Sequence, residues 1–310
     1  MAFIEVQNVT FEYPGKKALD DVSFSIPEGS VVALVGPNGA GKTTLMRCLV
    51  ALDQPQSGKI IMNGVNVEED PRAVHAMCGY LSDFFGLYDA LSVRQCLTYA
   101  AWSQNLPAGK IAKTIDAVAE QTELVDMLEK KAGDLSRGYR QRLGIAMALI
   151  HDPKVLILDE PASGMDPEAR IGLSRLMRRL RHTGKTIIVS SHILNELEDY
   201  CTAMLVIRDG KMSEHVTLKD FSARAVKTLR IVIAEVTEAH MDFVSKQPHV
   251  SEVRIEEGII LCAYAGSDEE QRAFLKALVA ADIPVLSFEA AAHRLYDAYM
   301  NISTQSAEKK

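Results

Sequence analysis

Short apolar runs separated by turn residues fill the first fifth of the chain, which is the pattern of β-strands. Residues 3–27 alternate between apolar and polar side chains and contain Pro-Gly-type turns, so they predict antiparallel strands. The apolar run 30–35 predicts one more strand, and a helix is expected to begin at Thr43. Residues 56–64 read as a strand closed by an Asn-Gly turn.

Residues 90–150 change to helical periodicity. Ser92 and Gln95 have the spacing of a capping box that opens a helix through about Ser103. Further helical stretches are expected at 110–122, 125–130 and 140–150. After them, the apolar runs 155–158 and 186–191 are typical of buried parallel strands, with a helix between them over 167–183 and a hairpin from 203 onward. This part therefore predicts an α/β domain that carries a helical subdomain, about residues 84–150.

A second domain is expected after a boundary near residue 220, which gives domains 1–220 and 221–310. The predicted elements of the second domain are strand 228–236, helix 237–246, strands 250–256 and 258–264, helix 267–281, strand 283–288 and a last helix 289–302. The order βαββαβ is that of a small α+β, ferredoxin-like domain.

Composition narrows the class of protein. The chain has 310 residues, 47% of them apolar, and a net charge of −7, which allows two ordinary cores and argues against a nucleic-acid partner. Its five cysteines lack Cys-x-x-Cys spacing and are expected to be small buried hydrophobes in a reducing compartment. Neither a signal peptide nor an apolar run of the ~18–20 residues needed to cross a bilayer is present, so any role at a membrane requires another chain to supply the spans.

The segment around which the chain is organised follows the strand 30–35. It has the phosphate-loop pattern Gly, four residues, Gly, Lys and Thr. Backbone N–H groups of such a loop, together with a helix N-terminus, bind phosphate. Lys42 can reach the β- and γ-phosphates, and the Thr43 hydroxyl can ligate Mg²⁺. The expected nucleotide contacts are Gly36, Pro37, Asn38, Gly39, Ala40, Gly41, Lys42, Thr43 and Thr44.

Three polar residues at strand ends complete the expected chemistry of phosphoryl transfer to water. Asp159 is placed to bind Mg²⁺ directly or through a water molecule, and Glu160 to polarise the attacking water. His192 is placed to hydrogen-bond the γ-phosphate. A single acid or histidine at a strand end is common and has little weight. The prediction therefore rests on the occurrence of all three residues together and in this order.

Residues 3 to about 215 resemble the ATP-binding subunits of ABC transporters. The resemblance rests on the phosphate loop 36–44, the signature-like Leu-Ser-Arg-Gly-Tyr at 135–139, the acidic strand 156–160, the loop 163–166 and His192. It implies an ATPase that uses ATP and Mg²⁺ and whose nucleotide-binding domains pair head to tail, as a homodimer or a heterodimer. Ser136 and Gly138 of one domain then contact the γ-phosphate held by the other, at a helix N-terminus suited to anions.

The resemblance also gives Tyr13 a role as the aromatic residue that stacks on adenine; the alternative is an ordinary strand aromatic. It implies a separate transmembrane permease as partner, export as the direction, and a peripheral position on the cytoplasmic face of the cell membrane.

Two other classes of function remain open. One is a soluble ABC ATPase, although a second nucleotide domain or a coiled-coil insertion is not visible, and the other is a regulatory module that binds ATP and hydrolyses it weakly.

The sequence departs from the family pattern at two places. Arg137 and Tyr139 replace the Gly and Gln of the usual signature, and Asp83 stands where the family has a Gln that contacts Mg²⁺ and the attacking water. Aspartate can still ligate Mg²⁺, although its reach differs. Because Glu160 and His192 are both present, an active ATPase is expected. The apolar side chains that follow Asp83 are expected either to form a docking groove for the permease or to pack inside the helical subdomain: Phe84, Phe85, Leu87 and Tyr88.

Overall fold

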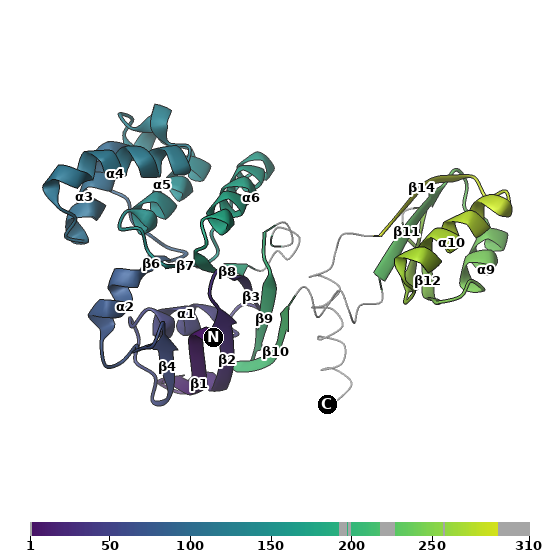
Figure 1. The fold of residues 1–310 in the computed structure, drawn as a ribbon, viewed down its shortest axis with the longest axis horizontal. Helices are drawn as coiled ribbons and strands as arrows, with labels where there is room; N and C mark the ends of the chain where they lie inside the picture. The colour runs from purple at the N-terminus through teal and green to yellow at the C-terminus, as the bar shows by residue number, and fades with distance from the viewer. Residues whose placement is uncertain (1, 192–196, 198–199, 218–226, 257, 291–310) are drawn as a thin grey trace. The chain divides into compact units, whose positions relative to one another are not determined.

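The computed structural model describes residues 2–191, 197, 200–217, 227–256 and 258–290, and the chain divides into two compact units, Met1–Thr217 and Leu218–Lys310 (Figure 1). Each unit is described by itself below. His192 and the greater part of the predicted last helix lie outside the described residues. None of the helices within the described ranges is long and apolar enough to cross a lipid bilayer.

The first unit contains an antiparallel sheet with the strand order β2-β1-β4-β5. Antiparallel strands over residues 3–27 agree with the alternating pattern there. Its strands are β1 (Ala2–Tyr13), β2 (Lys16–Pro27), β4 (Ser57–Met62) and β5 (Val65–Asn66). The predicted Asn-Gly turn joins β4 to β5, with φ of 48° at Asn63 and 79° at Gly64. Positive φ at both central residues matches the twist of the two strands that they connect.

A second, six-stranded sheet carries the phosphate loop, and its order is β10-β9-β3-β8-β7-β6. The strands are β3 (Val31–Val35), β6 (Cys78–Leu81), β7 (Val155–Leu158), β8 (Thr186–Ser191), β9 (Ala203–Arg208) and β10 (Lys211–Thr217). All are parallel except the edge strand β10. Every residue of β3, β7 and β8 is buried, which explains why β3 and β7 read as continuous apolar runs and why 187–189 of β8 is apolar.

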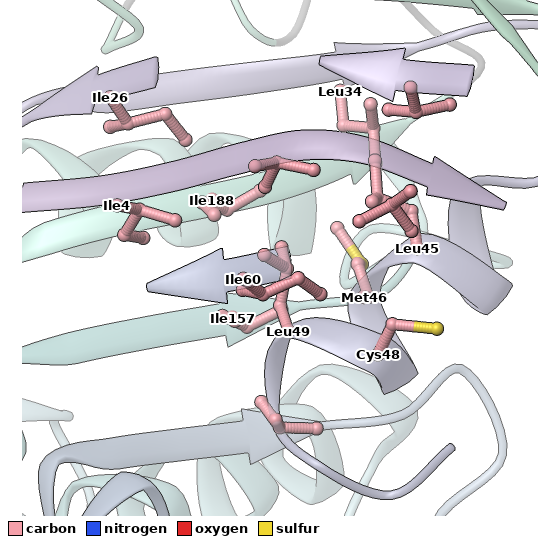
Figure 2. Close-up of a cluster of buried hydrophobic side chains, with 14 of the residues drawn as sticks. Ile4, Ile26, Leu34, Leu45, Met46, Cys48, Leu49, Ile60, Ile157 and Ile188 are labelled. Atoms are coloured by element: carbon pink, nitrogen blue, oxygen red, sulfur yellow. The ribbon is translucent and has the colours of Figure 1, made fainter. Parts of the chain in front are cut away.

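Helix α1 (Lys42–Leu49) packs between the two sheets (Figures 1 and 2). Its buried side chains Leu45, Met46, Cys48 and Leu49 share one core with residues of both sheets. Those labelled in Figure 2 are Leu34, Ile157 and Ile188 from the parallel sheet and Ile4, Ile26 and Ile60 from the antiparallel sheet. Each fully buried Leu or Ile contributes about 1.5–3 kcal/mol of transfer free energy. This burial on two sides fixes α1, and with it the loop that precedes it.

Elsewhere in the described part of the first unit, the helices are α2 (Pro71–Met77), α3 (Val93–Ser103), α4 (Ala108–Gln121), α5 (Arg137–Leu149) and α6 (Pro167–His182), with 3₁₀ turns at Val125–Met127 and Ala132–Asp134. The predicted capping box of Ser92 and Gln95 is present. Helix α5 starts three residues before the predicted position, because the Ser136 side chain accepts a hydrogen bond from the N–H of Tyr139 and so caps it. Only Val125–Met127 of the predicted helix 125–130 is helical.

The second unit has the predicted βαββαβ order, with a four-stranded antiparallel sheet in the ferredoxin-like order β12-β13-β11-β14. Its elements are β11 (Lys227–Ile233), α9 (Glu238–Ser245), β12 (Val250–Glu256), β13 (Ile259–Tyr264), α10 (Asp268–Ala280) and β14 (Val285–Ala290). The prediction that a helix begins at 289 is wrong, because Glu289 and Ala290 pair with β11 as the last residues of β14.

All five cysteines are buried and free, as the sequence predicts. Burial raises the pKa of each thiol, to about 12 for Cys48 and Cys78, so the side chains are neutral at physiological pH. Cys48 and Cys78 act as small apolar residues in the core of the first unit and Cys262 in that of the second.

The loop between β3 and α1 passes very close to the backbone of its neighbours. A Cβ at Gly36 would lie 2.2 Å from the carbonyl oxygen of Ile207 on β9. A Cβ at Gly41, where φ is +108°, would lie 2.4 Å from the carbonyl oxygen of Ala18 on β2. Side chains at these two positions would push the loop away from the strands that hold it.

We expect Gly36→Ala to lower the free energy of unfolding by about 2 kcal/mol or more, because the added methyl group overlaps a backbone atom that cannot move alone. The measurement is the thermal midpoint of the nucleotide-free protein. The matched control is Gly109→Ala on α4, where a Cβ would meet no atom within 4 Å. A Gly36→Ala protein as stable as this control would contradict the description of the loop.

Candidate functional site

The phosphate loop joins the end of β3 to the start of α1, and Gly41 occupies the N-cap position of that helix. Gly41 supplies no capping side chain. The first N–H groups of a helix have no partner within the helix, and they lie at the positive end of its dipole. The loop therefore presents backbone donors of the kind that bind phosphate oxygens.

Lys42 is buried within this loop. Its Nζ donates to the carbonyl oxygens of Gly36, at 2.8 Å, and Pro37, at 3.4 Å, and lies 3.6 Å from Oε1 of Glu160. Only 7% of the Lys42 side chain and 14% of the Glu160 side chain are exposed. A buried ammonium requires such partners, and the same group is positioned to meet an anion that enters the loop.

A cavity of about 320 Å³ opens above the loop. The residues that line it are Tyr13, Lys16, Ala18, Asn38, Gly39, Gly41, Lys42, Thr43, Thr44, Asp83 and Glu160. The fold thus brings nine of the residues singled out in the sequence to one space, although they come from β1, the phosphate loop, and the ends of β6 and β7. Gly36, Pro37 and Ala40 belong to the loop but do not line the cavity.

Tyr13 ends β1 at the edge of this cavity. Its ring packs edge-on against Phe11, with 4.9 Å between ring centroids, and its hydroxyl lies 3.5 Å from Oγ1 of Thr44. The side chain is 42% exposed. A supported ring with an open face is the geometry that stacking on a flat ligand requires.

Asp159 and Glu160 follow β7 and face different surroundings. Asp159 is fully buried; its Oδ1 accepts a hydrogen bond of 2.5 Å from Oγ of Ser190, and its Oδ2 has no hydrogen-bond partner among the described residues. Glu160 has a φ of +48°, in the left-handed region that non-glycine residues seldom occupy, and its N–H donates to the same Ser190 oxygen at 2.8 Å.

The donors at this edge of the sheet fit Mg²⁺. Asp159 offers a buried carboxylate oxygen that needs a partner, and the hydroxyl of Thr43 and the carboxylate of Asp83 line the adjacent cavity. Hard oxygen donors are those that Mg²⁺ prefers, and the ion is usually held by one or two carboxylates together with phosphates and water.

The signature residues lie elsewhere in the same chain. Ser136 caps α5, and Gly138 is buried against α6, where a Cβ would lie 2.9 Å from Cβ of Ala169. Both residues are described, and neither lines the phosphate-loop cavity. A single chain therefore assembles the phosphate loop and the acids, but not the signature, in one site.

A second cavity of about 530 Å³ lies beside Asp83 and is lined by Asp83, Phe84, Phe85, Gly86, Arg137, Arg140 and Gln141. Asp83 lines both cavities. Phe84 is 92% and Tyr88 60% exposed, whereas Phe85 and Leu87 are half-buried. The Phe85 ring packs against α5, since a Cβ at Gly144 would lie 2.7 Å from it. Phe85 thus packs inside the helical subdomain, as one alternative predicts, and docking of the permease on the exposed Phe84 and Tyr88 stays a prediction.

Three residues of the site were not singled out from the sequence. Lys16 and Ala18 line the cavity from the start of β2, and Ser190 contacts both acids from β8. For Ser190, a signal was present: it is a polar residue near the end of a fully buried strand, directly after the apolar run 187–189. Lys16 and Ala18 lie at the cavity only because of the turn between β1 and β2.

Beside the acids, Tyr80 on β6 lies with its hydroxyl buried and without a hydrogen-bond partner among the described residues. Burial, and then the charge of Asp159, raise the pKa of Tyr80 to about 12. The phenol therefore stays neutral and adds no negative charge to the two carboxylates.

Comparison with known proteins agrees with this geometry. Residues 19–163 match the family described as ABC transporter. The chain is 31% identical to the uncharacterized ABC transporter ATP-binding protein YhcH of Bacillus subtilis, over 99% of this chain and 97% of that protein. It is also 31% identical to the Nod factor export ATP-binding protein I of Neorhizobium galegae, over 99% of this chain and 86% of that protein.

Among solved structures, CbiO1 from Clostridium perfringens, part of the ABC transporter complex CbiONQ, superimposes with a TM-score of 0.63 and 28% identity, covering 72% of this chain and 91% of that one. The phosphate loop, the cavity it lines and these similarities lead to one conclusion: the chain belongs to the ATP-binding subunits of ABC transporters, a family of ATP hydrolases.

Proposed function

We propose that this chain is the motor subunit of an ABC exporter and couples ATP hydrolysis in a dimer of nucleotide-binding domains to a separate transmembrane permease. The observation that carries the proposal is the position of Lys42. Its Nζ lies between the loop carbonyls and Oε1 of Glu160, at the base of a cavity large enough for phosphates. The cation and the carboxylate that phosphoryl transfer to water requires are thus already side by side.

ATP binding begins with the groups that line the cavity. The Tyr13 ring stacks on adenine, and the backbone N–H groups of residues 38–44 surround the phosphates. Lys42 exchanges its two carbonyl contacts for phosphate oxygens, which bind an ammonium more strongly because they are charged. This exchange withdraws the cation from Glu160 and leaves the Glu160 carboxylate to accept a proton.

For hydrolysis, Glu160 orients and polarises the attacking water, and His192 donates a hydrogen bond to the γ-phosphate. Thr43, Asp159 and Asp83 are the residues that would hold Mg²⁺, which supplies charge neutralisation across the β- and γ-phosphates when bound. Aspartate at position 83 has a side chain one methylene shorter than the family's Gln, and it keeps an oxygen donor on the cavity.

The site is completed by a second nucleotide-binding domain, identical or related. Ser136 and Gly138 stand at the N-terminus of α5, away from the phosphate loop of their own chain. A head-to-tail pair brings them to the γ-phosphate in the partner's loop, where the helix dipole favours negative charge. ATP then holds the two domains together, and its hydrolysis releases them.

The cavity beside Asp83 is proposed as the place where the permease docks. It combines the exposed apolar side chain of Phe84 with the cations Arg137 and Arg140, and it shares Asp83 with the nucleotide cavity. A ligand in one of the two cavities is therefore separated from the other cavity by the single residue Asp83. Export as the direction follows the name of the Nod factor export relative, and docking on a permease puts the chain on the cytoplasmic face of the cell membrane.

Asp83 also supports a second candidate function, that of a regulatory module which binds ATP and hydrolyses it weakly. A charged residue at this position, lining both cavities, alters the group that the family uses to contact the attacking water. ATP turnover of the purified chain distinguishes the two candidates, since the regulatory module would dimerise with ATP and hydrolyse it only weakly.

Replacing Glu160 by Gln is expected to reduce ATP turnover by about 10²–10⁴-fold, because the amide cannot accept the proton of the attacking water. ATP binding should persist, so the variant should accumulate as an ATP-bound dimer in size-exclusion chromatography. Glu120→Gln, which removes an exposed carboxylate on α4, is the matched control and should leave turnover unchanged. An active Glu160→Gln protein would show that another group activates the water.

The double variant Phe84→Glu with Tyr88→Glu is expected to detach the chain from the membrane fraction of its native cells, because two carboxylates oppose docking of an apolar segment. ATP turnover of the purified variant should stay within about threefold of wild type, since surface substitutions of this kind seldom disturb a fold. Val125→Glu, at an exposed apolar residue outside the cavity, is the control. Unchanged fractionation of the double variant would exclude this docking surface.

A further inference from the structure

One buried hydroxyl contacts both acids of the nucleotide site. Ser190 is fully buried near the end of β8. Its Oγ donates to Oδ1 of Asp159 at 2.5 Å and accepts from the N–H of Glu160 at 2.8 Å. A serine hydroxyl has one proton to donate, and here that proton is committed to a carboxylate.

The register of the sheet determines this position. Val189 of β8 lies opposite Leu158, the last residue of β7, so Ser190 is the next residue along and reaches Asp159 just beyond the strand end. On its other side, Ser190 pairs with Leu34 of β3, two residues before Gly36. The hydroxyl therefore lies between the strand that leads to the phosphate loop and the strand that carries the acids.

Each of its two hydrogen bonds constrains a different acid. The bond to Oδ1 of Asp159 is charge-assisted and leaves Oδ2 as the carboxylate oxygen without a partner. The bond from the N–H of Glu160 holds a residue whose φ of +48° is a strained backbone conformation that persists only when its surroundings maintain it. That backbone conformation places Oε1 of Glu160 3.6 Å from Lys42.

We propose that Ser190 is a positioning residue for hydrolysis. Its single hydroxyl fixes the position of the metal-binding carboxylate of Asp159 relative to the water-activating carboxylate of Glu160. The inference rests on the proposed function, in which Asp159 holds Mg²⁺ and Glu160 orients the water. Residues that hydrogen-bond to a metal ligand generally contribute about 10–100-fold to metal affinity or activity.

Another hydroxyl on the same strand provides a matched control. Thr186, at the opposite end of β8, is also buried, and its Oγ1 also accepts from a backbone N–H, that of Gly29 at 3.0 Å. Thr186→Val removes this bond without contact with either acid. Loss of such a hydrogen bond lowers stability in both cases, so general weakening of β8 is common to the two variants.

The experiment uses the purified full-length chain with Ser190→Ala, Ser190→Cys and Thr186→Val. Cysteine fills the space of serine with only a weak donor, so it removes the bonds without leaving a cavity. Five quantities are measured: the thermal midpoint, ADP affinity in EDTA, the affinity of the ADP complex for Mn²⁺ by electron paramagnetic resonance, and kcat and KM for ATP.

For both Ser190 variants, we expect ADP affinity in EDTA within about twofold of wild type, Mn²⁺ affinity lower by about tenfold or more, and kcat lower by about 10–100-fold with little change in KM. Thr186→Val should lower the thermal midpoint and leave Mn²⁺ affinity and kcat at wild-type values. If Ser190→Ala does not fold, Ser190→Cys decides the question.

Wild-type Mn²⁺ affinity and kcat in the Ser190 variants would overturn the proposal, and so would equal losses in Thr186→Val. Glu160→Gln separates these outcomes from failure of the proposed function. An active wild type, an inactive Glu160→Gln and an active Ser190→Ala reject the role of Ser190 alone. A wild type that neither hydrolyses ATP nor binds Mn²⁺ with ADP rejects the function and the positioning role together.

Discussion

The contact of α1 with two sheets at once is the constraint on which the rest of the structure depends. Its buried residues pack against the parallel sheet on one side and the antiparallel sheet on the other (Figure 2). The loop before it is held against Ile207 and Ala18 at distances that permit only glycine at positions 36 and 41. The position of the phosphate site is therefore a consequence of packing, and the ligand finds its backbone donors already arranged.

The order and pairing of the strands place the acids at this site. Strand β7 lies next to β8, which lies next to β3, so the residues that follow these strands come to one edge of the sheet. Asp159, Glu160 and Ser190 thus meet the phosphate loop, and Lys42 lies close enough to Glu160 for a direct ionic contact. The same edge receives Asp83 from the end of β6, which connects the nucleotide cavity to the second cavity.

Local patterns in the sequence predicted much of this. The phosphate loop, the capping box at Ser92, the Asn-Gly turn and the βαββαβ order depend on residues close together in the chain, and the structure contains all four. Features that depend on packing between distant segments could not be predicted from such local patterns. The exposure of Phe84 and the half-burial of Phe85 depend on whether α5 lies beneath each ring. The contact of Ser190 with two acids depends on the β7–β8 register, and the end of β14 depends on its pairing with β11.

The central claim is that each chain holds half of an ATP site, with the phosphate loop and the acids on one domain and the signature on its partner. Mixing two inactive variants, Lys42→Ala and Ser136→Glu, tests it directly. A mixed dimer contains one site in which an intact phosphate loop meets an intact signature, so the account predicts that ATP turnover reappears on mixing. If the mixture stays as inactive as either variant alone although mixed dimers form, phosphate loop and signature act within one chain and the account is wrong.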